Sequence, residues 1–209
     1  MTGYNKKINF FSHIIFVYKK NKIISKKNFL KNKKTISFEN IVNPIEKKSL
    51  YNKFSSRHNI NLHFKDKNYF IETIGYKNVT FRKKNSLDYS ENGNLISIKS
   101  CSLNFKQDIE YLSKIIKIKK KNNYFFFKNK AGKFIKFSES KYKLKQKIYL
   151  DSTGSNIMSF FVDNISLARK KLNSDKIKLT KIFKVKLLKQ NKIFFARFPS
   201  GMIFEFLNY

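Results

Sequence analysis

The chain has 209 residues, which is enough for one or two domains with a substantial hydrophobic core. It carries 46 Lys and Arg residues against 13 Asp and Glu residues, a formal net charge of +33 at pH 7. A hydrophobic content of 41% excludes a disordered polyelectrolyte, and six glycines and two prolines exclude collagen-like and proline-rich scaffolds. No stretch reaches the roughly 18 apolar residues of a membrane span, so we expect a soluble, folded protein.

Lysine supplies nearly all of the positive charge. Arginine, the better residue for bidentate contacts with phosphates and bases, occurs at four positions only, Arg57, Arg82, Arg169 and Arg197. We therefore interpret the charge mainly as a coding-composition effect, as in an AT-rich genome, and expect lysine runs such as Lys47-Lys48 to be solvent-exposed. The single cysteine, Cys101, excludes an intrachain disulfide and is expected to be a small buried hydrophobe. Its isolation fits a cytoplasmic location, with an organelle matrix as the alternative.

The N-terminal part predicts three strands. Residues 8–18 are interpreted as a first strand rather than a signal peptide, because His13 interrupts the apolar run and no small-residue cleavage site follows. A weak helical pattern covers 25–30, and 60–64 with 69–74 predict a hairpin. The polar stretch 82–94 predicts a linker. We place the domain boundary there, which gives an eroded unit with linker over 1–96 and a two-unit domain over 97–209.

The middle of the chain predicts a strand, a helix and a hairpin. The strand covers 98–105, and the helix carries apolar residues at helical spacing after Gln107-Asp108, which is interpreted as its N-cap. Strands at 124–127 and 134–137 flank a turn at Ala131-Gly132. The aromatic run in the first of these strands resembles a stacking surface for nucleic acid, but alternate rings of a hairpin strand face inward, so we interpret them as core.

The C-terminal part follows the same order. A strand over 157–162 leads through the N-cap Asp163-Asn164 into a helix, followed by strands within 177–188, 192–196 and 202–207. The last two strands enclose Phe198-Pro199-Ser200-Gly201, whose Pro at the second position and Gly at the fourth suit a type I turn.

The middle and C-terminal segments form an internal repeat. A shift of 69 residues places Gly132 on Gly201, Phe126 on Phe195 and Lys136 on Glu205. A fainter third copy at the N-terminus has its first strand at 12–18, with Glu72 in the place of Glu205 and Asn68 in the place of Gly201. The sequence thus predicts an α+β protein built from tandem strand-helix-strand-strand-strand units.

Such tandem βαβββ units resemble the vicinal oxygen chelate superfamily, which includes glyoxalases, epimerases, extradiol dioxygenases and bleomycin-resistance proteins. The segments that carry the resemblance are NIMSFFVDNISLARKKLNSDKI and KIFFARFPSGMIFEFLNY. They are similar to the family's opening strand and capped helix and to its closing hairpin with a glutamate on the last strand. The resemblance implies a half-open barrel around one site, a small polar or anionic metabolite as ligand, and lyase, isomerase or dioxygenase chemistry. Since dimers are common in this family, the resemblance also implies that the protein can form a homodimer.

The same resemblance implies a divalent metal held by a histidine on a first strand and a glutamate on a last strand. His13 and Glu72 match these positions in the N-terminal unit. Glu205 matches the second in the C-terminal unit, whose histidine position falls near Ile157. In the middle unit the positions fall near Ser100 and on Lys136, which are not metal ligands.

Two pairings of the units remain open. If the adjacent units in 97–209 close one barrel, Glu205 faces Lys136 in a metal-free pocket, and these two are the candidate catalytic residues. If the N-terminal unit pairs with the C-terminal one, His13, Glu72 and Glu205 meet and suit iron, manganese, nickel or zinc. We expect the adjacent pairing.

The residues outside this set have plainer interpretations. We expect His58, beside Arg57 in a polar turn, to be exposed, His63 to lie on a strand face, and Asp108 and Asp163 to cap helices. Nucleotide-binding and nucleophile motifs are absent from the sequence, which leaves acid–base chemistry on a small molecule. The alternative function is that of a basic nucleic-acid-binding or ribosome-associated protein from an AT-rich organelle or reduced genome.

Overall fold

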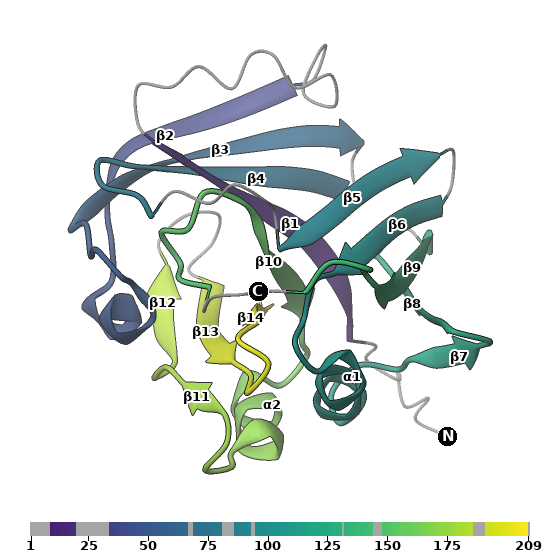
Figure 1. Cartoon of the computed structure of the whole chain (residues 1–209). Helices are drawn as coiled ribbons and strands as arrows, with labels where there is room; N and C mark the ends of the chain where they lie inside the picture. The colour runs from purple at the N-terminus through teal and green to yellow at the C-terminus, as the bar shows by residue number, and fades with distance from the viewer. Residues whose placement is uncertain are drawn as a thin grey trace, which may run out of the picture.

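In the residues that it describes, the computed structural model of the chain has two sheets and two α-helices (Figure 1). It describes residues 9–19, 34–66, 69–80, 86–92, 95–130, 132–143, 148–185 and 191–208. The expected helix at 25–30 and the turn residue Asn68 lie outside these ranges.

The secondary-structure elements follow in chain order. The N-terminal part holds β1 (Phe10–Lys19), β2 (Lys34–Val42), the short 3₁₀ helix η2 (Ile45–Leu50), β3 (Arg57–Asp66) and β4 (Tyr69–Tyr76). The middle part holds β5 (Leu87–Asn92), β6 (Leu95–Ser100), α1 (Phe105–Ser113), β7 (Lys119–Lys121), β8 (Tyr124–Lys128) and β9 (Phe134–Glu139). The C-terminal part holds β10 (Gly154–Phe161), α2 (Ile165–Leu172), β11 (Lys178–Leu179), β12 (Phe183–Val185), β13 (Asn191–Arg197) and β14 (Ile203–Asn208).

All three parts share one strand order, in which the first strand pairs parallel with the last strand and the other strands follow by antiparallel pairing. The N-terminal part has the order β1-β4-β3-β2, the middle part β6-β9-β8-β7, and the C-terminal part β10-β14-β13, with β11 and β12 paired to β13. The predicted α+β architecture of βαβββ units is therefore confirmed. The N-terminal unit, expected to be eroded, has its four strands in place.

The hairpins of the middle and C-terminal units match turn for turn. The Gly132 amide donates to Asn129 O at 3.0 Å, and the Gly201 amide donates to Phe198 O at 2.9 Å. Both glycines have positive φ, 79° and 87°, a backbone region that glycine enters without strain. Across the two hairpins Phe126 pairs with Lys136 and Phe195 with Glu205, which is the register that the 69-residue repeat predicts.

The units pair differently from our expectation. β1 of the N-terminal unit pairs antiparallel with β10 of the C-terminal unit, and the two units form one nine-stranded sheet. The middle unit forms a separate five-stranded sheet of order β5-β6-β9-β8-β7. The adjacent pairing within 97–209 was therefore wrong.

The strand β5 gives the physical reason for this pairing. It lies within the segment 82–94, which we interpreted as a linker, and it pairs with β6 along the edge that would have met a second unit. In contrast, residues 11–17 of β1 and 155–160 of β10 are all buried. Such two-sided burial is typical of central strands and favours their pairing with each other.

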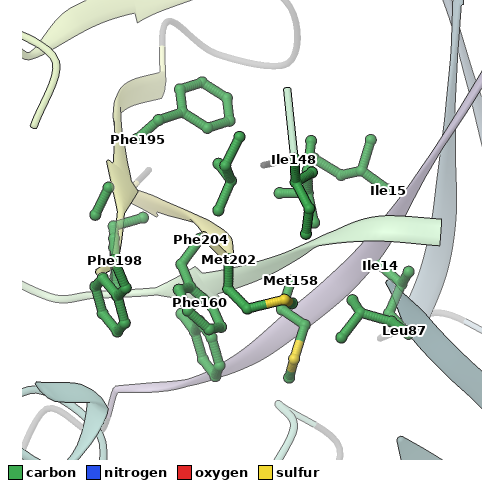
Figure 2. Packing of buried hydrophobic residues seen from close by; sticks show 14 of the residues in the cluster. Ile14, Ile15, Leu87, Ile148, Met158, Phe160, Phe195, Phe198, Met202 and Phe204 are labelled. Atoms are coloured by element: carbon green, nitrogen blue, oxygen red, sulfur yellow. The ribbon is translucent and has the colours of Figure 1, made fainter. Parts of the chain in front are cut away.

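The two sheets pack through aromatic side chains. The ring of Phe127 on β8 lies 5.9 Å from that of Phe11 on β1 and 5.6 Å from that of Phe160 on β10. Figure 2 shows the adjoining cluster, in which Met158 and Met202 lie among Phe160, Phe204 and neighbouring aliphatic side chains. Cys101 is buried as expected. This packing leaves the other face of the nine-stranded sheet to line a cavity.

Both helices begin at an asparagine cap. Asn104 Oδ1 accepts from the Gln107 amide at 3.2 Å, and Asn164 Oδ1 accepts from the Leu167 amide at 2.9 Å. Of the predicted pair Asp163-Asn164, Asn164 is the cap and Asp163 precedes it, so the expectation that Asp163 caps the helix was wrong. Asp108 lies inside α1 and is fully buried, so its interpretation as a cap was also wrong. None of the described helices is long and apolar enough to cross a membrane.

Candidate functional site

A cavity of about 90 Å³ lies against the nine-stranded sheet, between strands of the N-terminal and C-terminal units; we call it the sheet cavity. Most of its wall is apolar, with contributions from β2, β3, β12 and β13. Its polar lining residues are His13, Lys47, His58, Glu72, Asn191 and Glu205. The volume is well below the roughly 300–1,000 Å³ of pockets for drug-sized ligands, so the sheet cavity suits a molecule of a few heavy atoms.

Strand register brings His13, Glu72 and Glu205 together. Ser159 on β10 is the cross-strand partner of His13 on β1 and of Glu205 on β14, so these side chains share one face of the sheet. On the other side of β1, Glu72 of β4 pairs with Ile15, two residues beyond His13. His13 Nε2 lies 3.1 Å from Glu72 Oε2 and 3.8 Å from Glu205 Oε2.

Hydrogen bonds orient the imidazole of His13. Its Nδ1 lies 2.9 Å from Ser12 Oγ, and its Nε2 makes the 3.1 Å contact with Glu72. An ionised carboxylate accepts only, so Nε2 carries the proton and, in the neutral ring, Nδ1 accepts from the Ser12 hydroxyl. His13 is thus held in the tautomer whose proton points at a carboxylate.

Glu205 is a carboxylate held in an apolar environment. It is 5% exposed, and Ser159 Oγ donates to its Oε2 at 2.5 Å. Burial and, secondarily, the neighbouring Glu72 raise the pKa of Glu205 to about 6, although His13, Ser159 and Lys47 act in the opposite direction. This carboxyl exchanges its proton close to neutral pH, as a general acid or base requires.

Lys47 contributes a buried cation to the same cavity. It is 7% exposed, and its Nζ lies 5.8 Å from the ring centroid of Phe183 and 5.5 Å from that of Phe195. Burial lowers the pKa of Lys47 to about 8, and the negative charges of Glu205 and Glu72 oppose that change. The expectation that the run Lys47-Lys48 is solvated was therefore wrong for Lys47, whereas Lys48 is exposed.

His58 on β3 lies on the same cavity wall. It is 2% exposed, and its Nδ1 has no hydrogen-bond partner among the described residues. Burial and the nearby Lys47 lower the pKa of His58 to about 3, so the ring is neutral. We expected an exposed residue, and the structure contradicts that. The unpartnered Nδ1 and the equally unpartnered Oδ1 of Asn191 are buried polar atoms at a cavity that a ligand would satisfy.

Lys136, the other candidate catalytic residue, does not join Glu205. It lies on β9 of the five-stranded sheet, where its Nζ is 3.6 Å from the ring centroid of Tyr124, and the residues that line the sheet cavity do not include it. The reason is the unit pairing described above, which places β14 and β9 in different sheets. His63 lies on β3 as expected, with Thr35 Oγ1 and Thr73 Oγ1 each 3.0 Å from its ring nitrogens.

The three predicted metal ligands fit a divalent ion in chemical type, because one imidazole and two carboxylates suit iron, manganese, nickel or zinc. In the structure these donors are engaged with one another and with Ser159, and the position expected for a further histidine is Ile157. Within the described ranges no three His, Cys, Asp or Glu side chains have the arrangement of a metal site. Metal binding by these residues stays a prediction.

Two patterns in the sequence indicate that His58 and Lys47, which we expected to be exposed, are buried. His58 alternates with Ile60 and Leu62 on β3, a period of two that places it on a buried face. Lys47 precedes Leu50 by three residues in η2, and residues three apart lie on one side of a 3₁₀ helix. The pattern for Lys47 consists of one residue pair in a short helix. Because Lys47 also belongs to a run of lysines, we interpreted it as exposed.

Neither a protein-family model nor a curated protein sequence matches the chain. Among solved structures it is similar to a putative dioxygenase from Bacillus subtilis, with 9% identity, 96% of this chain and 64% of that chain covered, and a TM-score of 0.38. It is also similar to a glyoxalase I mutant from Zea mays, with 11% identity, 98% of this chain and 71% of that chain covered, and a TM-score of 0.35. A third similar structure is methylmalonyl-CoA epimerase from Mycobacterium tuberculosis, with 8% identity, 95% of this chain and 87% of that chain covered, and a TM-score of 0.43.

The chain spans 64% of the length of the putative dioxygenase. Because the TM-scores are low, the fold description depends on the strand order that the chain itself repeats. Two βαβββ-type units curl around one cavity, with His13, Glu72 and Glu205 on first and last strands. This is the architecture that the resemblance to the vicinal oxygen chelate superfamily implies.

Proposed function

We propose that the sheet cavity binds a small polar molecule and that Glu205, supported by His13 and Glu72, transfers protons to and from it. The observation that carries this proposal is the contact of His13 Nε2 with two carboxylates, at 3.1 and 3.8 Å, on the wall of a cavity. The reaction class is proton abstraction and return, as in an isomerase or lyase.

Each residue has a distinct role in this proposal. Glu205, with its pKa raised to about 6, takes a proton from the bound molecule or returns one. Glu72 holds His13 by accepting from its Nε2–H, and His13 in turn stabilises the negative charge that Glu205 acquires. The apolar walls keep bulk water from the cluster, which strengthens these interactions.

Proton exchange in deuterated buffer tests the proposal. Small α-hydroxyketones are incubated with the protein, and incorporation of deuterium at carbon is followed by NMR. We expect exchange with wild-type protein and a loss of at least about tenfold in Glu205→Gln, because general acid–base groups contribute about 10²–10⁴-fold. Glu39→Gln is the matched control, since Glu39 is exposed on the cavity-lining strand β2. Equal exchange in all three proteins, or none in any, would refute the proposal.

The alternative function predicted from the sequence, nucleic-acid binding, is favoured by a different surface. An open groove of about 740 Å³ beside α1 is lined by four lysines, by the rings of Tyr124, Phe125 and Tyr142, and by three acidic residues, Asp88, Glu110 and Glu139. Rings between lysines suit stacking of single-stranded bases. The lysines are Lys99, Lys106, Lys120 and Lys141. Retention of the protein on single-stranded RNA with a steep salt dependence, reduced in Tyr124→Ala, would support this function, and elution at low salt would contradict it.

A further inference from the structure

We propose that Lys47 is an amine nucleophile that captures a small uncharged aldehyde or ketone in the sheet cavity as an imine. This inference uses the same cavity as the proposed function and deepens it by naming the class of molecule bound. It needs a chemical step at Lys47 rather than proton transfer by Glu205, so the two are tested separately.

The placement of Lys47 is that of a reactive amine rather than of a structural ion pair. Its side chain enters the cavity from η2, and its Nζ lies over the rings of Phe183 and Phe195. No hydrogen bond or ion pair joins this Nζ to any side chain in the described ranges. An unengaged amine against aromatic walls is desolvated, and desolvation is one of the ways in which a lysine is activated as a nucleophile.

The surrounding carboxylates oppose the loss of the proton from Lys47, and burial of the amine favours it. Glu205, Glu72 and Glu46 act on Lys47 from three elements, and His58 faces it as a neutral ring. Because burial outweighs the three carboxylates, the pKa of Lys47 is lowered to about 8, and about one tenth of the amine is neutral at pH 7. An exposed lysine with a pKa of 10.5 has roughly 300 times less of the neutral form at that pH.

The anchoring of η2 keeps Lys47 in place. The carbonyl of Leu50 accepts from the Leu150 amide at 3.0 Å and from Arg197 Nη2 at 3.0 Å. The Asp151 carboxylate accepts from the amides of Asn52 and Lys53 at 2.9 and 3.0 Å. The segment that carries Lys47 is therefore fixed to the C-terminal unit, and a reactive group on such a support is preorganised.

The chemical step is redox-neutral. The ammonium first gives up one proton to a neighbouring carboxylate, and the lone pair of the neutral Nζ attacks the carbonyl carbon while the carbonyl π electrons move to oxygen. The oxygen takes the proton that Nζ loses on forming the C–N bond, which gives a neutral carbinolamine. The carboxylate then returns its proton to the hydroxyl, which leaves as water while the nitrogen lone pair forms the C=N bond. In total two hydrogens of the ammonium leave with the carbonyl oxygen, and the iminium keeps the positive charge that faces Glu72 and Glu205. The neutral ring of His58 lines the same cavity, and its Nδ1, which has no hydrogen-bond partner among the described residues, is the candidate acceptor for the carbinolamine hydroxyl.

Size and charge define the class of carbonyl compound. The volume of about 90 Å³ is several times the roughly 10–15 Å³ that one water molecule needs on the same measure, so the cavity admits a molecule of a few heavy atoms. An additional carboxylate on the ligand would meet the two glutamates, so an uncharged compound is favoured over a keto acid. Dihydroxyacetone meets both conditions and serves as the probe, with pyruvate as its charged counterpart.

Borohydride trapping tests the inference. Wild-type protein at pH 7 is incubated with dihydroxyacetone, the iminium is reduced with sodium borohydride to a stable secondary amine, and the modified lysines are located by peptide mass spectrometry. We expect Lys47 to be modified at least about tenfold faster than the exposed neighbour Lys48, and pyruvate to label Lys47 more slowly. Lys47→Met should lose this fast labelling, and Lys48→Met should keep it.

Adducts distributed over the exposed lysines, with Lys47 modified no faster than Lys48, would overturn the inference. The wild-type mapping gives this answer even if Lys47→Met does not fold. Deuterium exchange without trapping would refute the imine and leave the proposed proton transfer standing. Trapping at Lys47 with no effect of Glu205→Gln on exchange would refute the proton transfer and leave the imine standing.

Discussion

His13 Nε2 lies 3.8 Å from Glu205 Oε2, although the two residues belong to opposite ends of the chain. Ser159, the cross-strand partner of both, joins them through the adjacent strands β1, β10 and β14. The candidate site therefore exists only when the first and last units share a sheet.

The first prediction concerns the pH dependence of stability at Glu205. Its pKa is about 6 in the folded chain against 4.5 for the ordinary group, so the folded chain binds protons more tightly than the unfolded chain. Glu205 in its protonated form therefore raises the free energy of unfolding below about pH 4.5, and this stabilisation is lost as the pH rises through about 6. A difference of about 1.5 in pKa corresponds to about 2 kcal/mol.

Denaturant unfolding of wild type and Glu205→Gln between pH 4 and pH 8 measures this loss. The free energy of unfolding of wild type should fall by about 2 kcal/mol relative to Glu205→Gln across the range. The control Glu39→Gln should follow wild type, since Glu39 is exposed. Parallel curves for wild type and Glu205→Gln would show that the carboxyl does not titrate as described.

The second prediction concerns the titration of Lys47. Burial lowers the pKa of this amine to about 8, against the effects of Glu205, Glu72 and Glu46. NMR of protein with ¹³C-labelled lysine side chains should show one resonance that titrates near pH 8, absent in Lys47→Met and present in Lys48→Met. If every lysine resonance titrates near the ordinary 10.5, Lys47 is solvated and the description of the cavity is wrong.

The third prediction concerns Arg197, which supports the position of Lys47. Its Nη2 donates to Leu50 O at 3.0 Å and to Ile148 O at 2.9 Å. Arg197→Met removes the donor to Ile148 O and one of the two donors to Leu50 O, which keeps the Leu150 amide, and should lower the free energy of unfolding by about 2–3 kcal/mol. The same change should move the Lys47 titration back toward its ordinary value. A destabilised variant in which Lys47 still titrates near pH 8 would show that η2 keeps its place without Arg197.

The fourth prediction concerns Gly75 on β4. A Cβ at this position would lie 2.8 Å from Cζ and 2.9 Å from Cε2 of the Tyr18 ring, whose hydroxyl accepts from Asn61. Gly75→Ala should therefore lower the free energy of unfolding by about 1–3 kcal/mol. In a Tyr18→Ala background the obstacle is absent, so the added methyl should have a much smaller effect. Equal losses in both backgrounds would assign the effect to the backbone instead.

The metal prediction from the sequence is tested by elemental analysis of the purified protein. If the prediction holds, the wild-type protein contains stoichiometric iron, manganese, nickel or zinc, and the variants Glu72→Ala and Glu205→Ala lose the ion. Because His13 Nε2–H donates to Glu72, an ion taken up there must displace that proton, and binding should weaken as the pH falls. A wild-type protein without metal would remove the prediction and leave the three residues as a hydrogen-bonded acid–base group.

The repeat could be predicted from the sequence because it depends on local interactions. The turns around Gly132 and Gly201 close through hydrogen bonds between residues three and four apart, and strand alternation then fixes the partners Phe126–Lys136 and Phe195–Glu205. The same local rules identified His13, Glu72 and Glu205 as equivalent positions on first and last strands.

The choice of partner units could not be predicted this way. Strand edges are chemically alike, and which edges meet depends on what else covers them. Here β5 covers the edge of β6, and β1 takes the corresponding edge of β10. That one pairing decided that Glu205 meets His13 rather than Lys136.

The sequence by itself thus determined the unit, its turns and the faces of its strands, because these follow from residue periodicity and backbone geometry over short distances. Only the tertiary structure decided that Lys47 and His58 are buried beside His13, Glu72 and Glu205. Arg197 fixes η2 to the C-terminal unit, and His58 on β3 lines the cavity that both units enclose. Side-chain solvation and pKa respond to that assembled environment rather than to neighbours in the sequence.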